Sequence, residues 1–306
     1  MRPSMLNFFK HRPTGLLARY VDSFWYRGQT EAATTGMLVL PSGRAEFVFS
    51  LDGAPQACWT GLDRSGQRRD LSYATLRLPN CAPVASALSG YGAAFGVSFK
   101  PHGLRHFCRV AFTDVEPEVA SLSDLCGRSA EDLVQRLTEA PTPPAKFAVM
   151  EAWLWQHVRE PHRAYRQVER AVVLLSDPAS LRSVDSVARE VGLSPRRLLN
   201  LFREDVGLAP KTFARVMRFG ASIRLVRDAG HARWTDIAAM CNFYDQAHLV
   251  REFHSLAGMS PTSYMQQKTA GHANCLPWIP PGSARAESNV HHAGGKPNGL
   301  HLSVPR

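Results

Sequence analysis

Two short stretches of the chain carry side chains that hydrogen-bond well to the edges of nucleic-acid bases. Arg196 and Asn200 lie one helical turn apart in the first stretch, and Gln246 and Arg251 lie in the second. Arg can donate two hydrogen bonds to guanine, and Asn or Gln can pair with adenine, each discriminating by about 1–3 kcal/mol. Recognition of bases in this way requires helices that hold these side chains on one face. It therefore depends on the secondary structure around the two stretches.

The two stretches belong to two copies of one pattern, residues 187–210 and 237–261. Each copy has a β-branched residue before Ala, a turn residue (Gly192 or Asn242), a large apolar residue, a later Phe and a closing Gly-x-x-Pro. The offset between the copies is 50 residues at the turn and 51 at the Phe, so the second copy carries one extra residue. The matched turn, Phe and closure predict one supersecondary unit used twice.

Each copy predicts a helix-turn-helix. Gly192 supplies the positive φ that ends the first helix without a steric penalty, and Asn242 is the best substitute because Asn tolerates that region. Ser194 caps the second helix and Pro195 occupies its first position, where a missing N–H costs nothing. Asp245 is the predicted cap in the second copy.

Recognition helices are therefore predicted at about residues 194–205 and 245–256, with Leu198 and Phe202 buried in the first. A second helix with a polar outer face is the element that enters a major groove. The predicted DNA-binding residues are Arg196, Arg197, Leu199, Asn200, Arg203, Gln246, Ala247, Val250, Arg251 and His254. Of these, Arg197, Arg203 and His254 suit phosphate contacts, which set register and affinity.

Residues 166–268 resemble the DNA-binding domain of AraC/XylS-type transcription regulators, which holds two helix-turn-helix units joined by a long helix. The matching residues are Val187, Ala188, Gly192, Leu193, Ser194, Phe202, Gly207, Pro210, Arg218, Ile237, Ala238, Phe243, Asp245, Gln246, Phe253, Gly258, Ser260 and Pro261. The sequence departs from the family at Asn242, where Gly is usual, and at Ser222, where Ala is usual. The resemblance implies a sequence-specific DNA-binding transcription regulator, with residues 211–227 as the joining helix.

Other interpretations of the repeat stay open. Any two helices joined by a Gly turn show part of the pattern, and a helical solenoid would want three or more units at a shorter period. An interaction module whose basic helices bind protein is a third alternative, and salt-insensitive binding to a protein without DNA retention would favour it.

The first half of the chain predicts a β-rich domain. Strands are expected near residues 20–26, 45–51, 58–61, 74–78 and 93–99, and residues 37–40 are apolar. Short strands separated by Gly and Pro turns indicate a small antiparallel barrel or sandwich. Residues 41–49 and 95–125 are similar to a sensor-type domain found ahead of AraC-type modules, which implies a cupin-like barrel. His102 stands where that family usually has Gly, and Arg44 and Ala45 stand where an acidic or polar residue is usual.

We therefore predict an α+β protein of two domains. A β-rich sensor or dimerisation-type domain with C-terminal helices spans residues 1–164, and the DNA-binding domain spans residues 165–268. Residues 269–306 are rich in Pro, Gly, Ser, His and Asn and have few large apolar side chains. Such a segment cannot bury enough surface to order itself, so it is predicted to be disordered.

The composition fits a polyanionic partner, since the net charge is +10 and the pI is about 9.6. Residues 165–268 carry 15 Lys and Arg against 10 Asp and Glu, so the repeat region is enriched in positively charged side chains. The six cysteines form no C-x-x-C pair, as expected for reduced thiols. No apolar run predicts a signal peptide or a membrane span, so a cytoplasmic location is expected.

An enzymatic interpretation would rest on His102, His106 and Cys108, because the spacing of the two His suits metal ligands on one helix face. No second clustered pair supports it, and the sequence has no G-x-S-x-G motif. A DNA-repair methyltransferase fused to an AraC-type domain would need a Pro-Cys-His setting, which none of the cysteines has. The sequence therefore predicts no enzyme, no cofactor and no metal site. Double-stranded DNA is the expected partner, while RNA polymerase, a small-molecule effector and a second copy of the chain stay open.

Overall fold

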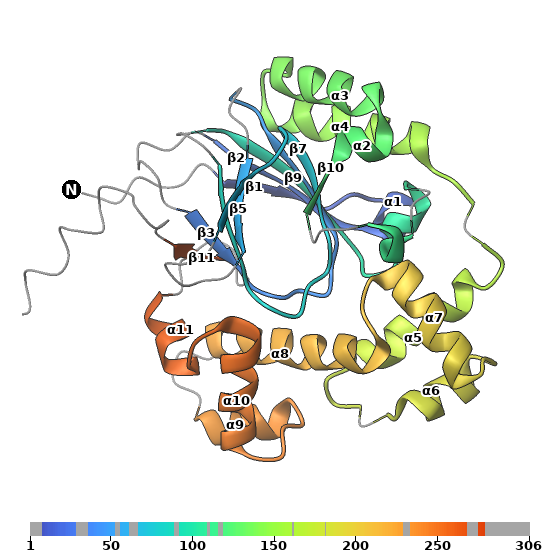
Figure 1. Ribbon diagram of the computed structural model, residues 1–306, viewed down its shortest axis with the longest axis vertical. Coiled ribbons are helices and arrows are strands. Elements are labelled where there is room, and N and C mark those ends of the chain that lie inside the picture. Colours follow the sequence, from blue (N-terminus) through green and yellow to red (C-terminus); the bar gives the residue numbers. More distant parts are fainter. Residues whose placement is uncertain are drawn as a thin grey trace, which may run out of the picture.

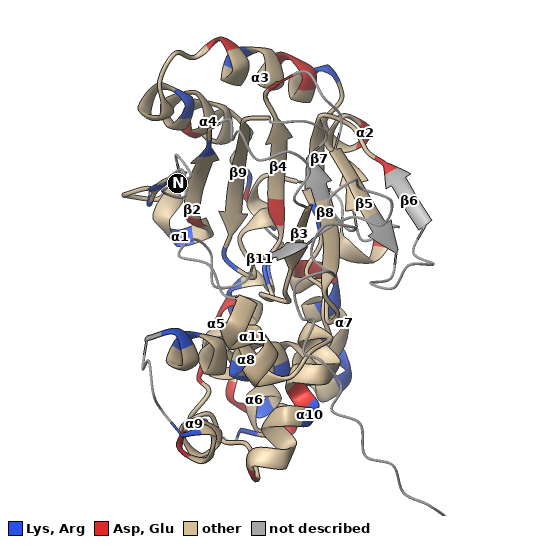
Figure 2. Ribbon diagram, turned by 90° about the vertical axis from the view of Figure 1, so that its left-hand side faces the viewer, with Lys and Arg blue, Asp and Glu red and all other residues tan. Residues whose placement is uncertain are grey.

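The computed structural model divides into a β-rich domain and a layer of helices beneath it, which confirms the predicted α+β class (Figure 1). The structure describes residues 8–28, 36–52, 56–60, 67–88, 92–108, 111–115, 119–160, 162–180, 182–228, 233–267 and 275–278. Figure 2 shows the same arrangement from the side, with helices α3 and α4 above the sheets and the remaining long helices below them.

Two antiparallel sheets build the first domain. The first sheet has the order β1 (Phe8–His11), β2 (Val21–Arg27), β9 (Ala94–Phe99), β4 (Glu46–Ser50), β7 (Ala74–Arg77) and β10 (Val119–Ser121). The second has the order β11 (Cys275–Trp278), β3 (Gly36–Val39), β8 (Val84–Leu88), β5 (Gln56–Thr60) and β6 (Gln67–Asp70). The short elements of this domain are α1 (Leu17–Tyr20), η1 (Leu104–His106), η2 (Phe112–Asp114) and α2 (Leu122–Cys126).

The two faces of the first sheet differ in polarity because side chains alternate along each strand. On β4, Phe47 and Phe49 belong to the apolar core, and the ring of Phe47 lies 6.3 Å from that of Trp153. Trp153 comes from α4 (Pro143–His157), which packs with α3 (Arg128–Glu139) over this face. Glu46 and Ser50 therefore point the other way, toward the second sheet.

In the described part of the chain, seven helices form the second domain. They are α5 (Tyr165–Ser176), α6 (Val184–Glu190), α7 (Pro195–Val206), α8 (Pro210–Asp228), α9 (Trp234–Met240), α10 (Gln246–Ala257) and α11 (Pro261–Gln267). Helix α8 runs beneath the sheets and buries Phe213, Phe219 and Ile223 completely. The apolar cluster around them includes Leu38 and Leu40 of the β-rich domain, while the main core of that domain is a separate cluster. Among the described helices, none has the length and hydropathy needed to span a bilayer.

The prediction of disorder for residues 269–306 is wrong for Cys275–Trp278, which form β11 at the edge of the second sheet. Leu276 pairs with Leu38 of β3 and is 1% exposed, so this short apolar stretch buries enough surface to order itself. An edge strand also tolerates Pro277, because one row of its backbone groups needs no partner. The other residues of the predicted tail lie outside the described part of the chain.

Candidate nucleic-acid interface

The first helix-turn-helix unit consists of α6, the turn at Gly192 and α7. Gly192 has φ +71°, as predicted, and the N–H of Leu193 donates to the carbonyl oxygen of Ala188 at 2.9 Å. The hydroxyl of Ser194 accepts a hydrogen bond from the N–H of Arg197 at 3.2 Å, and Pro195 follows it at the start of α7. The predicted cap and turn are thus both confirmed.

The second unit, α9 and α10, repeats this geometry with different residues. Asn242 has φ 54° and is the only non-glycine with positive φ among the described residues. Its side-chain Nδ2 donates to the carbonyl oxygen of Pro178 at 2.9 Å, which helps to hold the turn. Asp245 caps α10 by accepting from the N–H of His248 at 2.6 Å. Asn therefore occupies the left-handed turn position, and Asp the cap, as the sequence predicted.

The predicted DNA-binding residues lie on the outer faces of α7 and α10, whose inner faces are buried. Phe202 of α7 and Phe253 of α10 are both 0% exposed. The exposed members of the predicted set are Arg196, Arg197, Asn200, Arg203, Gln246, Ala247, Arg251 and His254. Leu199 and Val250 are half-buried, so they present only part of their side chains. Which bases these residues contact stays a prediction.

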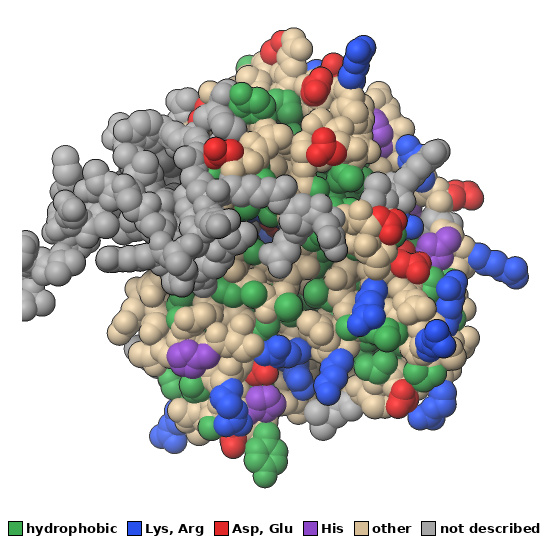
Figure 3. Space-filling model, viewed as in Figure 1, with side chains coloured by type: hydrophobic (Ala, Val, Ile, Leu, Met, Phe, Trp, Pro, Cys, Tyr) green, Lys and Arg blue, Asp and Glu red, His purple; other side chains and the backbone are tan. Residues whose placement is uncertain are grey.

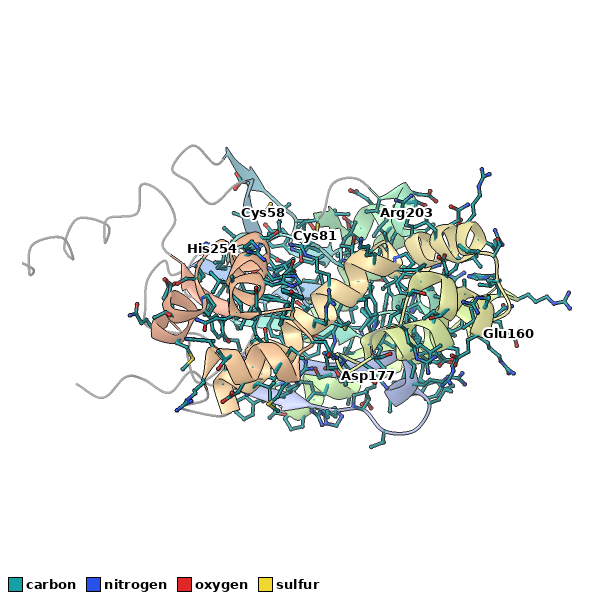
Figure 4. All side chains as sticks on the ribbon, turned by 90° about the horizontal axis from the view of Figure 1, so that it is seen from below. Cys58, Cys81, Glu160, Asp177, Arg203 and His254 are labelled. Carbon is teal, nitrogen blue, oxygen red and sulfur yellow. The ribbon has the colours of Figure 1, made fainter. Side chains whose placement is uncertain are left out.

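The two outer faces are on the same side of the helical domain. Seen from below, Arg203 of α7 and His254 of α10 both lie toward the top of the view, whereas Asp177 lies toward the bottom (Figure 4). Lys and Arg side chains gather over the lower half of the face in Figure 3, where the helical domain lies.

Helix α8 sets the orientation of α10. Arg215 donates from Nε to Glu252 at 2.5 Å and from Nη2 to Ser255 at 2.6 Å. The guanidinium of Arg218 lies 5.9 Å from the centre of the Phe243 ring, a cation–π contact. These two arginines of α8 are therefore bound to protein groups, and they position the second unit.

A buried carboxylate on α7 joins the first unit to the rest of the molecule. Asp205 is 0% exposed and accepts from Nε of Arg105 at 3.0 Å. Its second oxygen lies 2.7 Å from Nε2 of His162. No sequence pattern marks Asp205, because its partners lie 100 and 43 residues away.

Further contacts surround this link. A Cβ on Gly207, just after α7, would lie 3.2 Å from the Phe112 ring of η2, so the two domains touch closely there. The hydroxyl of Tyr165 on α5 donates to the carbonyl oxygen of His102 at 2.9 Å. Burial lowers the pKa of His102 to about 4, despite the favourable charge of nearby Glu169. His102 is thus a buried part of the interface between α5 and the β-rich domain.

The residues of the metal alternative are part of this packing. His102 precedes the single-turn helix η1, so the two His do not share a helix face. The His106 ring stacks on Tyr20 at 3.6 Å, and its Nδ1 lies 3.1 Å from the Arg159 carbonyl oxygen. A hydrogen bond with the Cys126 thiol, together with burial, raises the pKa of Cys108. Within the described ranges, no group of three or more His, Cys, Asp or Glu is placed to hold a metal.

Polar side chains occupy the space between the two sheets, a feature that the strand pattern did not reveal. The buried ones include Ser23, Ser50, Gln56, Thr75, Ser86 and Ser98. Arg77 of β7 donates to Ser86 of β8 at 2.6 Å, and Ser98 donates to Glu46 at 2.5 Å. A cavity of about 20 Å³ adjoins Arg77 and Glu46, which is room for about one water molecule.

Two family models match separate parts of the chain. Residues 187–267 match the model of a helix-turn-helix domain family, and residues 9–120 match that of a domain of unknown function (DUF6597). No curated protein matches the sequence of the chain.

Solved structures of regulators resemble the fold at low identity. ToxT from Vibrio cholerae O395 is 11% identical over 86% of this chain and 99% of its own, with a TM-score of 0.44. An AraC-type regulator from Chromobacterium violaceum is 22% identical over 35% of this chain and 96% of its own, with a TM-score of 0.32. A DNA-binding transcriptional dual regulator from Escherichia coli K-12 is 21% identical over 33% of this chain and 89% of its own, with a TM-score of 0.29. These values are too low to carry a statement about function. The chain thus carries a helix-turn-helix domain, which contains the motifs that resemble AraC-type regulators, and this domain follows a β-rich domain that matches a family without known function.

Proposed function

We propose that this protein regulates transcription by reading a specific DNA sequence with α7 and α10 in successive major grooves. The observation that carries the proposal is the pair of exposed polar faces, held on one side of the molecule by α8. Recognition helices that serve one duplex face must lie about one turn, roughly 34 Å, apart. Arg196 and Arg251 are assigned to guanine edges, and Asn200 and Gln246 to adenine edges.

The test is selection of genomic DNA fragments by the purified full-length protein, followed by titration of the retained sequence across salt. Arg196→Ala and Arg251→Ala are each expected to cost about 1–3 kcal/mol of specific affinity. Arg189→Ala is the matched control, because Arg189 is equally exposed but lies on α6. A steep salt dependence without any shared sequence would mean that the protein holds DNA without reading it.

We further propose that the β-rich domain gates DNA binding through the first unit. Asp205 lies on the recognition helix itself, while Arg105 belongs to η1 of the β-rich domain. A shift of η1 therefore acts directly on the orientation of α7. The existence of an effector, dimerisation and contact with RNA polymerase stay open.

The gating proposal is tested with Arg105→Ala in the full chain. Freed from this contact, α7 is expected to bind the selected DNA with an affinity that differs several-fold from that of the wild type. Arg128→Ala is the control, because Arg128 is exposed on α3 of the same domain. Equal DNA affinity of the wild type and Arg105→Ala would remove the link from the mechanism.

A further inference from the structure

The second helix-turn-helix unit contains one residue that the first lacks. In the first unit a single residue separates the turn residue Gly192 from the cap Ser194. In the second unit two residues separate Asn242 from the cap Asp245, and the added residue is Tyr244. Because the first unit closes without such a residue, the turn does not need it.

Tyr244 projects from a well-fixed backbone. Its side chain is 93% exposed, more than any other exposed large hydrophobic residue in the described part of the chain. Phe243 before it is buried, and Asp245 after it caps α10. The N–H of Tyr244 itself donates to Nδ1 of His248 at 3.3 Å. The segment is therefore anchored on both sides, while the ring stays in solvent.

An aromatic ring left in water contributes nothing to the fold, but it contributes strongly to interfaces. Tyr combines a large apolar surface with a hydroxyl that can donate a hydrogen bond, which suits a contact that is partly wet. Tyr244 lies directly before Gln246 and Ala247 in space as in sequence, with only the cap between them. It is therefore at the end of α10 that is proposed to enter the groove.

Charge also distinguishes the two units at this position. Helix α7 starts with Pro195, Arg196 and Arg197, which supply two exposed cations beside the groove. Helix α10 starts with Gln246 and Ala247, which supply none. The second unit thus needs another group to hold the DNA backbone at the start of its recognition helix.

We propose that Tyr244 is this group: its hydroxyl donates to a phosphate oxygen at the edge of the groove, and its ring packs on the adjoining deoxyribose. Tyr is among the side chains that commonly contact phosphates and sugars. The inference rests on the proposed function and adds a residue that the repeat pattern alone does not assign. It gives the second unit an uncharged anchor where the first unit has arginines.

The experiment compares full-length Tyr244→Ala and Tyr244→Phe on the selected DNA, with Tyr73→Ala as control. Tyr73 is 47% exposed in the β-rich domain, far from the recognition helices in sequence. Tyr244→Ala is expected to weaken binding about 10-fold, and Tyr244→Phe about 3-fold, because Phe keeps the ring but loses the hydroxyl. Unchanged thermal unfolding of both variants shows that the fold is intact.

The salt dependence separates this contact from those of the arginines. An uncharged contact releases no counterion, so Tyr244→Ala is expected to leave the salt slope unchanged. Arg197→Ala is expected to reduce the slope by about 0.9. Wild-type affinity in Tyr244→Ala, together with weakened binding in Arg251→Ala, would overturn the Tyr244 proposal alone and point to a protein partner for the ring. Failure of the wild type to retain any DNA sequence would overturn the proposed function, and the Tyr244 proposal with it.

Discussion

The two helix-turn-helix units share one backbone plan but are fastened to different parts of the molecule. The first is tied to the β-rich domain by Asp205 on α7 and by the close approach at Gly207. The second is tied to α8 by Arg215, which bonds Glu252 and Ser255 of α10. Two copies of one helix-turn-helix motif can therefore differ in the part of the molecule that holds each of them in place. Under the proposed gating, a change in the β-rich domain acts on the first unit, while the second unit keeps its contacts with α8.

The largest expected effect comes from removing the buried link of the first unit. Asp205→Ala leaves Arg105 without its carboxylate partner, and breaking a buried ion pair in this way costs about 3–5 kcal/mol of unfolding free energy. Glu252→Ala is the counterpart in the second unit, where the arginine partner is 32% exposed and the expected loss is about 1 kcal/mol. Urea unfolding of both variants measures the difference. Equal losses would show that the two fastenings are energetically alike.

Low pH is expected to destabilise the interface between the β-rich domain and the helices of the first unit. The folded pKa of His102 is about 4, below its ordinary value of 6.5, because the side chain is buried. Below pH 6.5 His102 is therefore protonated in the unfolded chain but not in the folded chain. The free energy of unfolding falls by up to roughly 3 kcal/mol as the pH approaches 4. Glu169, whose pKa is lowered mainly by its hydrogen bond with Arg19, adds a loss in the same direction at lower pH.

Unfolding free energies in urea at about pH 7 and about pH 5 check this expectation. His102→Gln is expected to flatten the dependence between these values. Hydrogen exchange is expected to accelerate in α5 and α7 before it does in α10, since only the former helices pack beside His102 and η2. Simultaneous acceleration of exchange in both units would contradict the idea that they are held by different parts of the molecule.

The smallest effect concerns the two turns. Gly192→Ala is expected to cost about 1–2 kcal/mol, because the left-handed conformation strains a Cβ. No heavy atom lies within 4 Å of the added Cβ, so the cost is that of the backbone alone. Gly192→Asn is expected to cost less, and Asn242→Gly to be nearly neutral, since relief of strain is offset by loss of the hydrogen bond to Pro178. Thermal unfolding of the three variants ranks them.

The helical domain could be predicted in detail because its signals are local. The glycine of one turn, the Ser-Pro start of α7 and the Asp cap of α10 each act within four residues. The extra residue of the second unit was also visible in the repeat offset. The exposure of this residue, Tyr244, could not be predicted, because the sequence pattern does not show whether its side chain points inward or outward.

The β-rich domain was predicted less completely, since strands depend on distant partners. No strand was predicted before residue 20, yet Phe8–His11 pairs with β2. The β8 segment Val84–Leu88 is rich in small residues, and β10 has only three residues, so neither has a clear strand pattern. Asp205 was missed for a related reason, because a buried charge is recognised only through partners that the fold brings to it.

The position of β11 affects how the molecule is assembled during synthesis. The β-rich domain obtains its last strand from residues 275–278, after the entire DNA-binding domain has been made. Until then the edge of β3 carries unpaired backbone groups, which can pair with another chain. Folding from the N-terminus onward therefore leaves the first domain open while the second forms. Closure of that edge marks the moment at which both domains are present and docked.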